Sequence, residues 1–193
     1  MNDASSGIRS SELYDWFKDF SHFEEFVSAN LKKSDKILML GCGNSKLSED
    51  MCLKGYKNIT NVDYAENVIN FMKERNLDKP EMKWITMNIK DMSDFSNGEF
   101  DAGDVWDPPE ELKVEVGKYL KEVSRVLKAN SGKFLYITFG QAVSLKFSLQ
   151  LTEVQHFRKI FLDKSEYNWK IETNTFGDAF HYFVYLMLKN CSS

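Results

Sequence analysis

A glycine-spaced turn between two apolar segments is the stretch of this chain best suited to binding a ligand. An unbroken apolar run occupies 37–40, the turn follows at Gly41, Cys42 and Gly43, and 46–53 carries apolar residues at helical spacing. This order predicts a strand, a turn and a helix. Such a turn lets the backbone approach a ligand, and the helix start offers unpaired N–H groups. A nucleotide-like ligand is therefore the first hypothesis.

A carboxylate follows at a distance that suits a ribose. The β-branched run 58–62 ends in Asp63, which lies 22 residues after Gly41. A carboxylate about 20 residues past the first glycine, at the tip of the second strand, can accept hydrogen bonds from ribose hydroxyls. A dinucleotide fits less well, because Lys46 occupies the place of the third glycine in G-x-G-x-x-G and would hinder close helix–strand packing.

Three blocks together carry a family resemblance: Leu-Gly-Cys-Gly-Asn-Ser at 40–45, Val-Asp-Tyr at 62–64 and Tyr-Asp-Trp-Phe at 14–17. They resemble the class I methyltransferases and, within these, the elongation factor 1A lysine methyltransferases, the methyltransferase-like 13 group. The resemblance extends to Lys189. The general class usually has an acid at the position of Met39, and the narrower group also lacks it.

The resemblance implies a function, a cofactor and a partner. It implies transfer of a methyl group from S-adenosylmethionine to lysine, with S-adenosylhomocysteine as product and elongation factor 1A as the protein substrate. The cofactor contacts that it implies are Trp16, Gly41, Cys42, Gly43, Asp63, Tyr64, Asn88 and Ile89.

Two of these positions have an alternative reading. Trp16 belongs to a motif that closes over the cofactor in the resembled family, but its ring could instead pack on the sheet. Relatives have an acid where this chain has Asn88, at the end of the expected third strand, to contact the adenine amino group. The amide oxygen of Asn88 can also accept from that amino group, although a simple turn residue is the alternative.

The region after the expected fourth strand departs from the family. Relatives carry an acid-Lys-Gly-Thr-x-Asp block there, whereas this chain passes from 99–105 almost directly to Trp106-Asp107-Pro108-Pro109. Residues 1–10 also lack the Tyr-Trp segment that helps to form the cofactor lid in relatives. The sequence therefore either lacks pieces or encodes an impaired or non-catalytic cofactor-binding module.

No catalytic residue can be assigned from these patterns. Asp104 and Asp107 are candidates by position alone, since ligands of open α/β sheets sit at the carboxyl ends of strands. The Asp-Pro-Pro at 107–109 is similar to the loop of methyltransferases that act on adenine or glutamine amides. Glu110 stands where that loop needs an aromatic platform, so this is the weaker alternative.

The amino-acid composition limits the classes of protein and partner that suit this chain. The chain has 193 residues, 42% hydrophobic and 28% charged, which suits one globular domain, and no apolar run approaches the length of a membrane span. A net charge of −4 does not indicate the clustered positive charge that nucleic-acid binding needs, and it suits a basic protein partner. The three cysteines and three histidines show neither disulfide nor metal spacing, which favours a cytoplasmic protein. We expect a monomer.

The remaining pattern predicts an α/β fold. Residues 1–10 are small and polar and are expected to be disordered, and 11–193 should form a single domain. Expected helices are 11–31, as one helix or as two short ones with a break near Ser21, 46–53, 65–75, 110–128 and 143–161. Expected strands are 37–40, 58–64, 82–89, one within 99–109, 133–139, 169–176 and 180–188. This order predicts the Rossmann-like seven-stranded methyltransferase sheet, mostly parallel, with a C-terminal antiparallel hairpin and helices on both faces.

Overall fold

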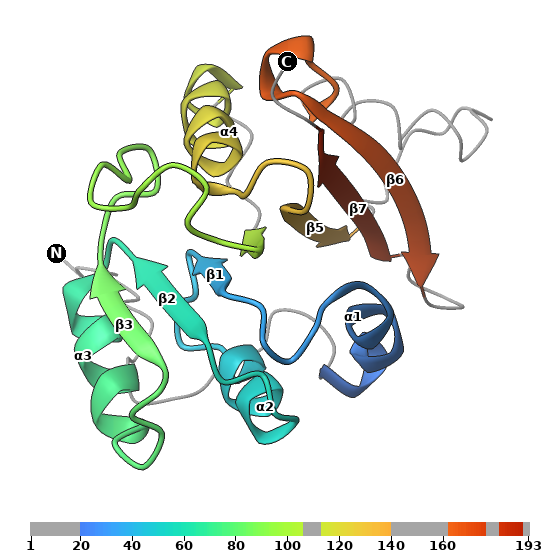
Figure 1. Ribbon diagram of the computed structural model, residues 1–193. Helices are drawn as coiled ribbons and strands as arrows, with labels where there is room; N and C mark the ends of the chain where they lie inside the picture. Colours follow the sequence, from blue (N-terminus) through green and yellow to red (C-terminus); the bar gives the residue numbers. More distant parts are fainter. Residues whose placement is uncertain (1–19, 106–112, 140–161, 177–181, 191–193) are drawn as a thin grey trace, which may run out of the picture.

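The computed structural model describes residues 20–105, 113–139, 162–176 and 182–190, and these contain a seven-stranded sheet (Figure 1). Its strands are β1 (Ile37–Leu40), β2 (Ile59–Asp63), β3 (Lys83–Thr86), β4 (Ala102–Val105), β5 (Lys133–Phe139), β6 (Trp169–Phe176) and β7 (Tyr182–Lys189). The strand order is β3-β2-β1-β4-β5-β7-β6, with β1 to β5 parallel and β7 antiparallel to both β5 and β6. The predicted fold is confirmed.

The central strand β1 shows why the sheet is buried on both sides. Its four residues are all buried, and their side chains alternate between the two faces. Leu38 and Leu40 join one core cluster, whereas Ile37 and Met39 join the other. The unbroken apolar run in the sequence is therefore the mark of a parallel strand with helices on both faces.

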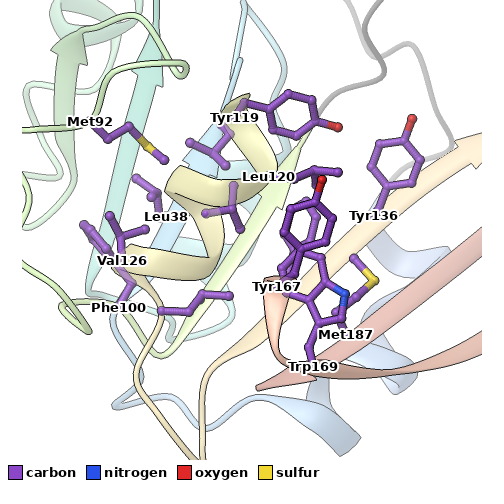
Figure 2. Packing of buried hydrophobic residues seen from close by; sticks show 14 of the residues in the cluster. Leu38, Met92, Phe100, Tyr119, Leu120, Val126, Tyr136, Tyr167, Trp169 and Met187 are labelled. Atoms are coloured by element: carbon purple, nitrogen blue, oxygen red, sulfur yellow. The ribbon is translucent and has the colours of Figure 1, made fainter. Parts of the chain in front are cut away.

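The described helices lie on both faces of the sheet. The helix α4 (Lys113–Val126) packs Leu120, Val123 and Val126 against one face of the sheet (Figure 2). The other face carries the 3-10 helix η1 (Phe20–His22), α1 (Glu24–Asn30) and α2 (Leu47–Leu53), while α3 (Glu66–Arg75) contacts β2 and β3. None of the described helices is long and apolar enough to cross a membrane.

The C-terminal hairpin extends the sheet with its more apolar strand inside. The segment 184–187 of β7 is fully buried between β5 and β6, whereas the outer strand β6 exposes Lys170, Glu172 and Thr173. Edge strands with charged residues are protected against pairing with other chains.

Several element bounds differ from the expectations. The third strand ends at Thr86, so Asn88 lies beyond the strand instead of at its tip. The first expected helix is, within the described residues, a 3-10 turn followed by α1, in line with the break expected near Ser21. The expected helix over 143–161 and the segment 1–10 lie outside the described residues.

Candidate functional site

The glycine turn has the backbone conformation that its residue types require. Gly41 has φ 64° and Gly43 has φ 50°, which is the left-handed region that favours glycine. Two hydrogen bonds tie the turn to the neighbouring strand β2: Cys42 N donates to Val62 O at 3.1 Å, and Gly43 N donates to Asp63 Oδ2 at 3.0 Å. The turn is thus held at the carboxyl ends of β1 and β2.

Asp63 bridges the two loops that leave these strands. Its side chain is buried, with Oδ2 accepting from Gly43 N and Oδ1 accepting from Ala65 N at 2.9 Å. Each carboxylate oxygen has a further lone pair for another donor. The carboxylate therefore fixes the turn and can still accept from a ligand hydroxyl.

The described residues leave space beside the turn. Among them, no atom lies within 4 Å of a Cβ built on Gly43, so none of them blocks a ligand from this peptide. Tyr64, directly after Asp63, is 83% exposed. The turn also lies where the sheet order reverses, because β1 pairs with both β2 and β4, and such a switch point is where open α/β sheets bind ligands.

Asn88 and Ile89 lie on the adjacent loop after β3. The backbone continues the pairing beyond the strand, since Met87 N donates to Asp63 O at 2.9 Å. Asn88 is exposed, and its Oδ1 accepts from Lys90 N at 3.0 Å, which is an Asx turn. Ile89 is half-buried and packs against the core cluster that contains α4. Asn88 therefore has a turn role in addition to any contact with a ligand.

Cys42 stands in the turn but is not a nucleophile. Burial, together with the neighbouring charge of Asp63, raises the pKa of the Cys42 thiol well above its usual range. A thiolate is the reactive form, so the raised pKa disfavours a nucleophilic role for this half-buried thiol.

The side chains of the remaining candidate residues, Trp16, Asp104 and Asp107, lie outside the description of the structure. Trp16 and Asp107 lie outside the described residues. Asp104 lies on β4 in register with Met39 and Leu135, but its side chain is not described. Within the described ranges, no three His, Cys, Asp or Glu side chains gather in a way that could hold a metal ion.

Comparison with known proteins decides the class of the site. The profile of a family described as "Methyltransferase domain" matches residues 37–130. EEF1A lysine methyltransferase 4 of Bos taurus is 32% identical over 197 residues, covering 95% of this chain and 71% of the relative. The Mus musculus protein of the same name is 34% identical over 190 residues, covering 91% and 69%. The chain belongs to the class I S-adenosylmethionine-dependent methyltransferases.

A solved structure supports the fold of this methyltransferase. An S-adenosylmethionine-dependent methyltransferase of Methanosarcina mazei is 20% identical, with a TM-score of 0.67, covering 86% of this chain and 98% of that one. As a member of the class I family, the enzyme uses S-adenosylmethionine and releases S-adenosylhomocysteine. Its open turn above Gly43 and the spare lone pairs of Asp63 fit a cofactor that carries a ribose.

Three buried polar residues on β2 and on the first turn of α2, next to the glycine turn, were not predicted from the sequence. Asn61, Ser48 and Glu49 are buried polar side chains: Ser48 donates to Asn61, and Glu49 accepts from Asn76 at the end of α3. One signal was present: Asn61 interrupts an otherwise apolar and β-branched strand, two residues before Asp63. A polar side chain inside a buried strand has to find partners, so its position marks a specific contact.

Proposed function

We propose that this methyltransferase transfers a methyl group from S-adenosylmethionine to lysine side chains of elongation factor 1A. The observation that carries the proposal is the similarity over 95% of the chain to a protein named as an EEF1A lysine methyltransferase. The glycine turn and Asp63 supply a matching place for the cofactor. Since translation elongation takes place in the cytoplasm, we expect this enzyme there.

The proposed cofactor site uses the residues that the sequence predicts. Asp63 would accept from the ribose hydroxyls, and the peptides of Gly41, Cys42 and Gly43 would lie along the cofactor, since glycine lets the backbone approach a ligand closely. Adenine would lie between the exposed Tyr64 and the loop with Asn88 and Ile89, and Trp16 would close over the site. S-adenosylmethionine, when bound, supplies a methyl group on a sulfonium for in-line attack by an amine.

The protein must also deliver a neutral amine. A free lysine has a pKa of about 10.4, so at pH 7 its deprotonation costs about 4.6 kcal/mol. An acceptor near the carboxyl end of β4 would orient the neutral amine toward the methyl group, and water would take up the proton that the ammonium group loses. Asp104 on β4 and Asp107 beyond it remain the candidates for this role by position.

The direct test uses elongation factor 1A made in bacteria, so that its lysines are unmodified. The full chain is incubated with this protein and isotopically labelled S-adenosylmethionine, and tryptic peptides are examined by mass spectrometry. We expect label on lysine. Asp63→Asn replaces one carboxylate oxygen with a donor that faces a backbone N–H, so transfer should fall by about tenfold or more.

Two outcomes separate the alternatives. Tight binding of S-adenosylhomocysteine with no label in elongation factor 1A, or in any protein of a cell lysate, would support a non-catalytic module. Label on another protein alone would keep the enzyme class and remove elongation factor 1A as the substrate.

A further inference from the structure

Three consecutive residues of β2 contact the turn and the helix behind it. Val62 O accepts from Cys42 N, Asp63 accepts from Gly43 N, and Asn61 Oδ1 accepts from the hydroxyl of Ser48 in the first turn of α2. Asn61 is fully buried, and its Nδ2 donates to Lys83 O on β3 at 3.1 Å. The side chain thus joins α2, β2 and β3 in one buried contact.

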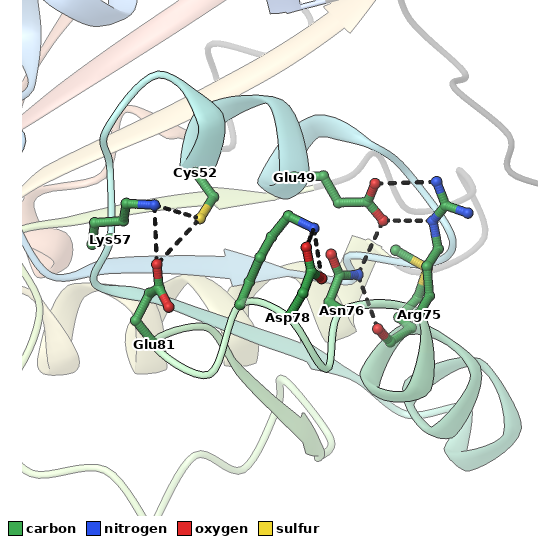
Figure 3. A network of polar contacts seen from close by, with 9 residues as sticks. Glu49, Cys52, Lys57, Arg75, Asn76, Asp78 and Glu81 are labelled. Atoms are coloured by element: carbon green, nitrogen blue, oxygen red, sulfur yellow. Dashed lines mark hydrogen bonds and ion pairs between the residues drawn. The ribbon is translucent and has the colours of Figure 1, made fainter.

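A second buried contact holds the same turn of α2 against α3 (Figure 3). Glu49 is only 8% exposed, and its Oε1 accepts from Arg75 Nε at 2.8 Å and from Asn76 Nδ2 at 3.0 Å. Asn76 Nδ2 also donates to Met72 O at 2.9 Å. Adjacent residues of α2, Ser48 and Glu49, therefore attach this helix to β2 and to the end of α3.

Helix α2 needs such attachments. It has seven residues, and its N-cap residue Lys46 makes no side-chain capping hydrogen bond. Isolated helices of this length are not stable in water, so tertiary contacts set where the helix begins. Its start in turn sets the far end of the glycine turn, because only Asn44, Ser45 and Lys46 separate Gly43 from Leu47.

We propose that Asn61 and Glu49 are positioning residues that hold the glycine turn in its cofactor-binding conformation. Neither side chain needs to touch the cofactor. This role rests on the proposed cofactor site at Gly41–Gly43 and Asp63. If the turn adopts the binding conformation in only a fraction of molecules, the apparent dissociation constant rises by the inverse of that fraction.

The test is calorimetric titration of the full chain with S-adenosylhomocysteine, alongside thermal unfolding of each variant. Asn61→Val removes both amide contacts, and Arg75→Met leaves Glu49 with Asn76 alone; Arg75 is at the surface, so this variant should fold. We expect the dissociation constant to rise about five- to thirtyfold in each. Glu49→Gln keeps one oxygen that can accept from Asn76 or Arg75 and should therefore bind more tightly than Glu49→Ala, which keeps none.

A matched control is available on the same helix. Lys54, just after α2, forms an ion pair with Glu24 at 2.8 Å, as short as the Arg75–Glu49 pair but at the opposite end. Lys54→Met should leave the dissociation constant unchanged. A merely structural role predicts lower melting temperatures with parental affinity in all folded variants, and that result would overturn the positioning role alone. Absence of binding by the parent chain would overturn the cofactor site and the positioning role together.

Discussion

Both halves of the sheet contain buried polar contacts, but those of the first half lie beside the glycine turn, whereas those of the second lie among aromatic rings. In the cofactor half, made of β1, β2, β3, α2 and α3, buried polar contacts between side chains and backbone join the elements. In the hairpin half, made of β4, β5, β7, β6 and α4, aromatic side chains pack closely around Phe134 and Trp169. Changes of polar geometry should therefore affect ligand binding in the first half, and changes of volume should affect stability in the second.

Truncation of Phe134 should have the largest effect on stability. This side chain is fully buried, and its ring centroid lies 5.9 Å from that of Trp169. Phe134→Ala should lower the free energy of unfolding by about 3–5 kcal/mol, because a cavity remains in the core. Urea unfolding checks the loss. At a low temperature where the variant is folded, affinity for S-adenosylhomocysteine should match the parent; a large loss of affinity would contradict the division into halves.

Alkaline pH should weaken the hairpin half through Tyr167. Burial, with the charge of Glu166, raises the pKa of Tyr167 to about 12. An unfolded tyrosine ionises near pH 10, so the unfolded state loses protons first and stability falls between about pH 10 and 12, by about 2 kcal/mol. The measurement is urea unfolding at pH 9 and 11.5 for the parent and Tyr167→Phe.

The Tyr167→Phe variant should lack this alkaline loss. Burial lowers the pKa of Lys189, which donates to Tyr167 O at 2.8 Å. This amine changes stability with the opposite sign, since its unfolded form then binds more protons. Only the difference between the parent and the variant isolates the phenol, and equal slopes in both proteins would show that Tyr167 does not carry the effect.

Gly43→Ala should separate binding from stability in the cofactor half. A Cβ at this position meets no atom of the described residues within 4 Å, but φ is 50°, so strain should cost about 1–2 kcal/mol of stability. The added methyl group would project into the space proposed for the cofactor. We expect the dissociation constant of S-adenosylhomocysteine to rise about tenfold or more by calorimetry. Unchanged affinity would argue that the cofactor lies elsewhere.

Gly103→Ala is the matched glycine substitution and should have the smallest effect. Gly103 lies on β4 without a positive φ, and its added Cβ would make ordinary contacts with Leu38 O at 3.5 Å and Phe134 Cδ2 at 3.9 Å. We expect stability to rise by about 0.5 kcal/mol, since alanine restricts the unfolded chain, with unchanged cofactor affinity. A clear destabilisation in thermal unfolding would show that β4 cannot accept even this volume.

Most of the fold could be predicted because its signals are local. The apolar run of β1, the glycine turn and the helical spacing of α4 each lie within one segment, and the structure has these elements. Strand β3 ends at Thr86, earlier than the alternating pattern predicts, because the side chain of Asn88 accepts a hydrogen bond from Lys90 N and forms a turn. Such side-chain competition with strand pairing is not visible in an alternating pattern.

The sequence by itself determined the turn conformation at Gly41 and Gly43, the carboxylate at Asp63 and the family, because residue type limits backbone angles and chemistry. Only the tertiary structure decided what holds the turn in place. Asn61 contacts Ser48, and Glu49 contacts Arg75, across loops and helices whose register no local pattern encodes. The strand order and the placement of α2 and α3 beside β2 bring these buried polar groups together, and burial makes each contact obligatory.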